Sequence, residues 1–328
     1  MAQQRLVAVS YPADAGITAI ITDVLDGTAG VAFLAGQDEA GQHAVLGQAD
    51  ALIGLRLGEE LPGGALSQAP RLGLIQVLSA GLDRVDFDAI PPDVAVAGNV
   101  GAYAQPIAEH VLAMTLSLAK RLQAGQAALA RGEFDRDAMS ATLHGAVCGI
   151  LGFGGIGQAT ARLMRAFGAR IHAVNTSGRT SEPVDWVGRL DQLGELLSEA
   201  DVLVIAIPLT AATRGLIGAR ELGLMKSSAI LVNVARGPLI DERALYEHLR
   251  ANPGFSAAID AWWDEPSGRT GFRAGYPFFA LPNLLGSPHN SGSVPRIMEV
   301  AARRAAENTG RFLRGEHVSG VARRADYA

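Results

Sequence analysis

Short runs of aliphatic and β-branched residues recur along the whole chain and alternate with stretches whose apolar residues have helical spacing. This alternation is typical of βαβ units, in which helices join the strands of a parallel sheet. It assigns the chain to the α/β class. Strands are predicted at residues 6–10, 31–34, 51–55, 74–78 and 94–97, and in a second, more regular series at 146–151, 171–174, 202–207, 229–234, 256–259 and 284–287.

The helices between these strands differ in character. A long apolar helix is predicted over residues 104–122, followed by a more polar stretch at 125–137. Further helices are expected at 158–167 and 241–252, and a charged amphipathic helix at 294–314. Since 328 residues are long for one compact domain, the chain is expected to form two.

Charge and cysteine content exclude several functions. The 28 basic and 33 acidic residues are well mixed, so no basic stripe would attract nucleic acid. A single cysteine, Cys148, cannot form an internal disulfide or a cysteine metal cluster, and no metal is expected. Its apolar neighbours predict that Cys148 is a small residue of the core. The apolar run at 6–9 is too short for a signal peptide, and no run is long enough to cross a membrane, so a cytoplasmic protein is expected.

Glycines with a characteristic spacing stand between the strand predicted at 146–151 and the helix that follows. Gly152 would form a tight turn, Gly154 would let a pyrophosphate approach the backbone, and Gly157 would allow close helix–strand packing. The free N–H groups at the helix start, including those of Gly155 and Ile156, would face the anion. This setting predicts dinucleotide binding.

The next strand ends without the acidic residue that would bind an adenosine ribose. Neutral polar residues and a guanidinium stand there instead and suit a 2′-phosphate, which predicts a preference for NADP. If Arg179 is only a solvated loop residue, NAD is the alternative. The residues expected to contact this end of the cofactor are Asn175, Thr176, Ser177, Arg179 and Thr180.

Three later strands are each followed by a residue suited to carbonyl reduction beside a carboxylate. Arg236 could grip the carboxylate with its planar fork, His289 could pass the proton that accompanies hydride, and Glu265 could orient the imidazole. Taken singly, each could be a structural residue or part of a turn. Together with the glycine loop they predict an active site at the carboxyl ends of the strands.

In these motifs the chain resembles the D-isomer-specific 2-hydroxyacid dehydrogenase family over essentially its whole length. The resemblance rests on the glycine loop at 152–157, Asn233 to Gly237, Asp260 to Pro266, and Ser287 to His289, in the family's order and spacing. It implies that Arg236 binds the substrate acid and that His289, paired with Glu265, is the acid–base residue. Further cofactor contacts are expected from Asp260 at the nicotinamide end, and from Pro208, Thr213, Val234, Ala235 and Gly292.

The resemblance also implies two Rossmann-like or flavodoxin-like doubly wound domains separated by a cleft. A discontinuous substrate-binding domain would comprise residues 1–101 and 290–328, and a dinucleotide-binding domain residues 102–289. A homodimer through the nucleotide domain and an arm at 122–143 is implied. Ala80 and Gly81 would offer backbone N–H groups to the substrate, while Arg56 could meet a distal anion or face solvent.

Departures from related chemistries narrow the expected reaction. Glu265 replaces the glutamine of formate dehydrogenases, and Ala80 replaces a lysine of phosphite dehydrogenases. These two residues argue against formate and phosphite as substrates. Reduction of a small 2-keto acid is the expected direction, because NADPH is usually held reduced in cells, and the side chain of the keto acid is undetermined. Trp262 and Trp263 either line the acyl pocket or belong to the core, and the loop at 267–280 is expected to be long for the family. A non-enzymatic, cofactor-sensing protein of the same fold is the alternative.

Overall fold

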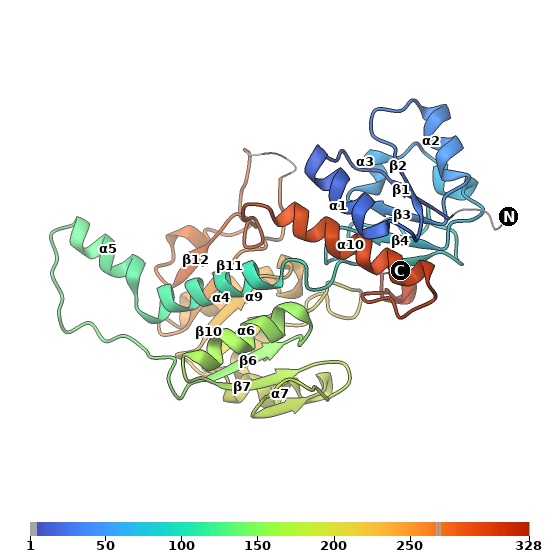
Figure 1. Ribbon diagram of the computed structural model, residues 1–328. Coiled ribbons are helices and arrows are strands. Elements are labelled where there is room, and N and C mark those ends of the chain that lie inside the picture. The colour runs from blue at the N-terminus through green and yellow to red at the C-terminus, as the bar shows by residue number, and fades with distance from the viewer. Residues whose placement is uncertain (1–4, 267, 269, 328) are drawn as a thin grey trace. The chain divides into compact units, whose positions relative to one another are not determined.

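The computed structural model describes residues 5–266, 268 and 270–327 (Figure 1). Residues 267 and 269 of the long loop expected at 267–280 lie outside this description. The chain divides into two compact units. Unit 1 comprises Met1–Tyr103 and Val294–Ala328, and unit 2 comprises Ala104–Ser293. The boundaries expected from the sequence were after residues 101 and 289.

Unit 1 contains a five-stranded parallel sheet with the order β2-β1-β3-β4-β5. This 2-1-3-4-5 order is that of flavodoxin-like folds. Its strands are β1 (Leu6–Val9), β2 (Gly30–Phe33), β3 (Ala51–Gly54), β4 (Leu74–Val77) and β5 (Ala95–Ala97). Its helices are α1 (Ala15–Leu25), α2 (Glu39–Leu46), α3 (Leu57–Glu60) and α10 (Ile297–Leu313).

The second segment of unit 1 completes the core that the first segment begins. Helix α10 packs against α1, β3 and β4, and its alanines are buried. The chain then returns to the sheet, where Val321 forms an antiparallel bridge with Ala97 of β5. The guanidinium of Arg324 donates to the carbonyls of Phe87 and Ile90 at 2.8 and 2.9 Å. Unit 1 therefore needs both segments for a closed core.

Unit 2 contains a seven-stranded parallel sheet with the order β12-β11-β10-β9-β6-β7-β8. Counted from β6, this is the Rossmann order 3-2-1-4-5-6 with one strand added beyond the sixth. The order reverses between β6 and β9, where dinucleotides bind in such sheets. The strands are β6 (Val147–Leu151), β7 (Arg170–Val174), β8 (Trp186–Gly188), β9 (Val202–Ile205), β10 (Ile230–Asn233), β11 (Ser256–Ile259) and β12 (Leu284–Gly286).

Helices cover both faces of this sheet. A Cβ on Gly149 of β6 would contact Leu196, whereas Ile150, the next residue, lies against Gly157. Successive strand residues point to opposite faces, so the helices carrying Leu196 and Gly157 lie on opposite sides. The unit is doubly wound, as predicted. Its helices are α4 (Ala104–Ala119), α5 (Leu122–Ala130), α6 (Gly155–Ala166), α7 (Leu193–Glu199), α8 (Ala219–Leu224) and α9 (Glu242–Ala251).

Several predicted boundaries are wrong. The helix expected over 104–122 is two helices, interrupted at Arg121, whose φ of 54° cannot continue an α-helix. Helix α5 extends into the more polar stretch at 125–137, where no helix was predicted, and strand β8 was not predicted either. Helix α6 begins at Gly155, three residues before its expected start, and α10 begins at Ile297. No helix in the described part of the chain is long and apolar enough to span a membrane.

Candidate active site

The glycine turn between β6 and α6 has the close contacts that its spacing predicts. Gly152 has a φ of 98°, and a Cβ there would lie 2.5 Å from the Ala206 carbonyl oxygen. A Cβ on Gly157 would lie 2.1 Å from the oxygen of Gly152. A Cβ on Gly154 would meet no atom within 4 Å, so space remains beside the helix N-terminus. This cradle fits a pyrophosphate.

The loop after β7 is held by the side chain that stands where an acidic residue is usual. Asn175 Oδ1 accepts from the N–H groups of Ser177 and Gly178 at 3.0 and 2.7 Å, and its amide donates to the Arg179 carbonyl at 2.9 Å. Asn175 thus shapes the loop that presents Thr176, Ser177 and Arg179, which are exposed.

The loop after β9 is organised in a similar way by Thr213. Its hydroxyl donates to the Pro208 carbonyl at 2.8 Å and accepts from the Thr210 N–H at 2.8 Å. Because β9 neighbours β6, this loop begins at the same edge of the sheet as the glycine turn.

Arg236 follows β10 in a loop fixed by two of its neighbours. The amide of Asn233, which is fully buried, donates to the Arg236 carbonyl at 2.9 Å, and its oxygen accepts from the Ala235 N–H at 3.1 Å. A Cβ on Gly237 would lie 2.3 Å from the carbonyl carbon of Trp262. The Arg236 loop therefore lies directly against the segment that leads to Glu265.

His289 and Glu265 form the central pair of the site. The imidazole Nδ1 lies 2.7 and 2.8 Å from Oε1 and Oε2 of Glu265, so both oxygens share one donor. Oε1 also accepts from the Trp262 N–H at 3.0 Å. The imidazole is 34% exposed and can therefore meet a small molecule, while the carboxylate is 19% exposed. His289 has a φ of 51°, which is uncommon for a residue with a side chain and indicates that its neighbours hold it in place.

Asp260, expected at the nicotinamide end of the cofactor, is fully buried. Its Oδ1 accepts from the Ser287 hydroxyl at 2.5 Å and the Asn290 N–H at 3.1 Å, and its Oδ2 from the Ser291 N–H at 3.2 Å. Its carbonyl accepts from the His289 N–H at 2.9 Å. The role that the structure gives Asp260 is to hold the loop that carries His289.

The tryptophans after Asp260 belong to an aromatic cluster. Trp262 is 6% exposed and donates to the Ser287 carbonyl at 2.9 Å, and Trp263 donates to the Ile240 carbonyl at 2.7 Å. The ring of Trp263 stacks on Phe278 at 5.6 Å. Of the two roles considered for this pair, these contacts favour the core.

The substrate residues expected from the first strand series lie in unit 1. Ala80 and Gly81 follow β4, and neither backbone N–H has an acceptor within the described residues. The side chain of Arg56 is 64% exposed and lies 3.4 Å from Glu59. It faces solvent, one of the two placements that the sequence left open.

The residues predicted in unit 2 thus gather at one edge of one sheet, since the carboxyl ends of parallel strands lie together. Val234, Ala235 and Gly292 stand in the same strand-end segments as Arg236 and His289. Sequence reasoning missed His110 of α4, whose Nε2 lies 3.0 Å from the Ser287 hydroxyl. A lone histidine in an apolar helix gave no signal. Among the described residues, no group of three or more His, Cys, Asp or Glu could hold a metal.

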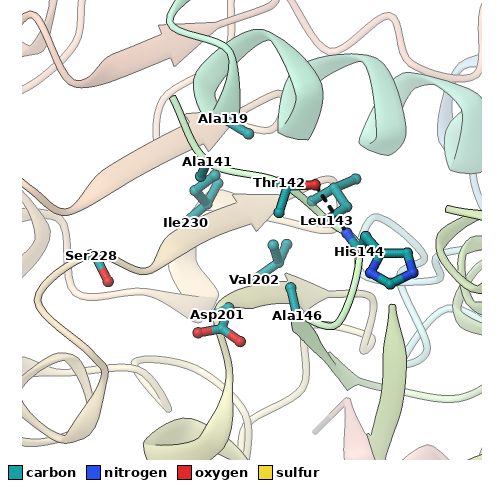
Figure 2. Close-up of a pocket in the computed structure, with 10 residues that line it drawn as sticks. All are labelled: Ala119, Ala141, Thr142, Leu143, His144, Ala146, Asp201, Val202, Ser228 and Ile230. Atoms are coloured by element: carbon teal, nitrogen blue, oxygen red, sulfur yellow. Dashed lines mark hydrogen bonds between the residues drawn. The ribbon is translucent and has the colours of Figure 1, made fainter. Parts of the chain in front are cut away.

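A cavity of about 310 Å³ lies at the opposite edge of this sheet (Figure 2). It is lined by Ala146, Val202 and Ile230, at the amino ends of β6, β9 and β10, and by residues 141–144. Asp201, which also lines the cavity, is paired with Lys226 at 2.7 Å. Ligands of open α/β sheets bind at the carboxyl ends of the strands, so this cavity is separate from the candidate site.

Comparison with known sequences identifies relatives of two kinds. Over 277 residues the chain is 32% identical to D-3-phosphoglycerate dehydrogenase of Methanocaldococcus jannaschii, covering 83% of this chain but only 51% of that protein. It is 34% identical over 278 residues to glyoxylate reductase of Aeropyrum pernix, covering 82% of this chain and 81% of the relative. The chain therefore spans about half of the first relative and most of the second.

The solved structures that resemble this chain over almost its whole length also include proteins named as dehydrogenases. A Pyrobaculum aerophilum protein provisionally named a formate dehydrogenase is 29% identical with a TM-score of 0.81, over 98% of this chain and 99% of that one. A D-isomer specific 2-hydroxyacid dehydrogenase of Xanthobacter autotrophicus Py2, solved with NADPH and MES, is 26% identical with a TM-score of 0.79, over 98% of both chains.

The sequence model of one protein family, the NAD-binding domain of the D-isomer specific 2-hydroxyacid dehydrogenases, matches residues 112–291. This match covers the glycine turn and the loops of Arg236, Glu265 and His289, and the glyoxylate reductase extends the similarity into unit 1. The chain is a member of the D-isomer specific 2-hydroxyacid dehydrogenase family, a family of oxidoreductases.

Proposed function

We propose that this protein reduces a small 2-keto acid to the D-2-hydroxy acid with a nicotinamide dinucleotide, and prefers NADPH. The observation that carries the proposal is the Glu265–His289 pair, set at the sheet edge that also carries the glycine turn and the Arg236 loop. In the opposite direction the same groups would oxidise the hydroxy acid.

The pair determines which imidazole nitrogen exchanges a proton. A carboxylate only accepts hydrogen bonds, so Nδ1 of His289 carries a hydrogen in both charge states. The exchanging proton is then at Nε2, which no hydrogen bond occupies in the described part of the chain. Protonated His289 donates this proton to the keto oxygen as the carbonyl carbon is reduced, and Glu265 stabilises the imidazolium beforehand.

Arg236 is proposed to bind the substrate carboxylate and to polarise the adjacent carbonyl. A guanidinium can hold a carboxylate through two parallel hydrogen bonds, which fixes the orientation of the keto group. In unit 1, Ala80 and Gly81 are proposed to donate backbone N–H groups to the substrate. Arg56 has a proposed role only for substrates with a distal anion.

When bound, the nicotinamide supplies the hydride. Gly152, Gly154, Gly155, Ile156 and Gly157 would hold the pyrophosphate at the start of α6. Arg179 and the hydroxyls of the loop after β7 would meet a 2′-phosphate, a role supported by the NADPH bound in the Xanthobacter relative. The other proposed contacts come from Pro208, Thr213, Val234, Ala235, Asp260 and Gly292.

The proposed substrate class is that of glyoxylate and hydroxypyruvate. It is supported by the glyoxylate reductases, of which the chain covers about four-fifths, whereas it covers half of the phosphoglycerate dehydrogenases. Glu265 weighs against formate, because a carboxylate there serves an acid–base histidine.

The test is a turnover assay on glyoxylate, hydroxypyruvate, pyruvate, phenylpyruvate and formate, each with both cofactors. We expect NADPH oxidation with at least one 2-keto acid and a loss of about 10²–10⁴-fold in kcat for His289→Ala, with NADPH affinity retained. Tight NADPH binding without turnover of any keto acid would contradict the proposal and favour a cofactor sensor of the same fold.

We also propose that two copies associate through unit 2. Helix α5 and the coil after it project from the body of this unit (Figure 1) and carry exposed apolar side chains: Leu122, Leu129, Phe134 and Met139. Large apolar side chains exposed together on one segment indicate an interaction surface. Light scattering after gel filtration should give twice the monomer mass of 34.1 kDa, and replacing both Phe134 and Met139 by Asp should give the monomer.

A further inference from the structure

We propose that His110 is a positioning residue, which fixes the loop of His289 through Ser287 and Asp260; this inference rests on the proposed function. His110 lies on α4, and its Nε2 is 3.0 Å from the Ser287 hydroxyl and 3.8 Å from Oδ1 of Asp260. Unlike Arg236, Glu265 and His289, it comes from a helix and not from a strand-end loop.

The hydrogen bonds of this group have one direction. Ser287 has a single hydroxyl hydrogen, and its 2.5 Å contact with Oδ1 of the buried Asp260 is the shortest in the group. Because a carboxylate only accepts hydrogen bonds, Ser287 donates its hydrogen to Asp260. The oxygen of Ser287 can then only accept a hydrogen bond from another group. Nε2 of His110 must therefore carry a hydrogen and donate to Ser287. The chain runs from His110 through Ser287 to Asp260.

Asp260 passes this constraint to the catalytic loop. Its carboxylate accepts from the N–H groups of Asn290 and Ser291, and its carbonyl accepts from the N–H of His289. The backbone of residues 289–291 is thus tied to one buried residue. That tie opposes relaxation of the left-handed conformation of His289, which has a φ of 51°.

Helix α4 provides a rigid support for this chain. It packs against α6, β10 and β11, the elements that carry the glycine turn and lead to the Arg236 and Glu265 loops. Met114, one turn after His110, lies 4.0 Å from the same serine hydroxyl through its sulfur. Two residues of one helix face therefore contact Ser287.

The test compares variants that keep the donor or acceptor with variants that remove it. His110→Gln retains an N–H at similar reach and Ser287→Thr retains the hydroxyl, whereas His110→Leu and Ser287→Ala do not. We expect kcat for glyoxylate or hydroxypyruvate to fall about 10- to 100-fold in His110→Leu and Ser287→Ala, since small displacements of a catalytic group have effects of this size. His110→Gln and Ser287→Thr should stay within about threefold of the wild type.

Two further readouts distinguish positioning from a general loss of structure. The NADPH dissociation constant should be unchanged in each variant, and the double variant His110→Leu/Ser287→Ala should be no slower than Ser287→Ala alone, because both act through one chain. His144→Leu, at an exposed histidine of the same unit, is the matched control. Full kcat in His110→Leu, equal losses in His110→Leu and His110→Gln, or additive losses would overturn the inference.

A measurement without turnover separates this inference from the proposed function. In ¹⁵N NMR spectra, Nε2 of His110 should be the ring nitrogen that carries a hydrogen, and His110→Leu should shift the imidazole signals of His289. Unchanged His289 signals would overturn the positioning role even if the wild type reduced no keto acid. Shifted signals without any turnover would uphold it and contradict only the enzymatic proposal.

Discussion

Both carboxylate oxygens of Glu265 lie within hydrogen-bonding distance of Nδ1 of His289, at 2.7 and 2.8 Å. We expect the negative charge of Glu265 to contribute to this pair in addition to the hydrogen bond. Glu265→Gln keeps an acceptor for Nδ1–H but removes the charge that stabilises the imidazolium. We expect kcat for keto acid reduction to fall about tenfold. An unchanged kcat would show that the carboxylate only orients the ring.

Arg236→Lys tests the proposed grip on the substrate. A lysine keeps the positive charge but cannot make two parallel hydrogen bonds with a carboxylate. We expect a higher KM for the keto acid together with a lower kcat, and no change in the KM for NADPH. If only the KM for the keto acid rises, Arg236 binds the substrate without orienting it for reaction.

The glycine turn offers a matched pair of substitutions. Gly157→Ala would place a methyl group 2.1 Å from a backbone oxygen, so it should lower the free energy of unfolding by about 1–3 kcal/mol. Gly154→Ala has open space for its methyl group in the free protein and should fold normally. Its methyl group would instead meet the pyrophosphate, so NADPH titration by fluorescence should show weaker binding. Normal NADPH affinity in Gly154→Ala would place the pyrophosphate elsewhere.

Cofactor choice is tested at Arg179. Removing the guanidinium in Arg179→Ala should raise the KM for NADPH about 10-fold and leave the KM for NADH nearly unchanged, because hydrogen bonds to a charged group typically contribute 1.5–3 kcal/mol. Arg220→Ala, at an arginine that is 85% exposed on α8, is the control. A wild type that prefers NADH would contradict the NADP proposal directly.

His172 of β7 predicts a pH dependence of stability. Burial, together with the charge of Arg170, holds the pKa of His172 below its usual value of 6.5. The unfolded chain therefore binds this proton more readily than the folded protein does. The stability contributed by neutral His172 is present above pH 6.5 and is lost as the pH falls through the lower folded value. Urea unfolding between pH 7.5 and 5.5 should show this loss, and His172→Asn should reduce the slope. His144→Asn, at an exposed histidine, should keep the wild-type slope.

The sequence predicted the sheets well because their buried strands are continuous apolar runs. It failed at β8, whose three residues form a partly exposed edge strand and give no such run. The prediction of one continuous helix also failed at Arg121, where the chain leaves the helical conformation although no glycine or proline stands there. Local composition does not reveal features of this kind, since tertiary contacts determine them.

The candidate site also contains residues that could be predicted from the sequence and residues that could not. Arg236, Glu265 and His289 stand in short motifs after strands, and a parallel sheet brings its strand ends together, so their proximity could be expected. The burial of Asp260 and the use of both its oxygens could not, because hydrogen bonds with residues 287–291 create them. His110 is separated from Ser287 by 177 positions and shares no motif with it.

The two segments of unit 1 have a consequence for biogenesis. Helix α10 and the contacts of Val321 and Arg324 are needed to close its core, yet they are translated only after the whole of unit 2. Unit 2 can fold while the sheet of unit 1 still exposes the apolar surface that α10 later covers. During synthesis the core formed by the first hundred residues therefore stays partly exposed until α10 is made. At this stage the nascent chain would most need a chaperone.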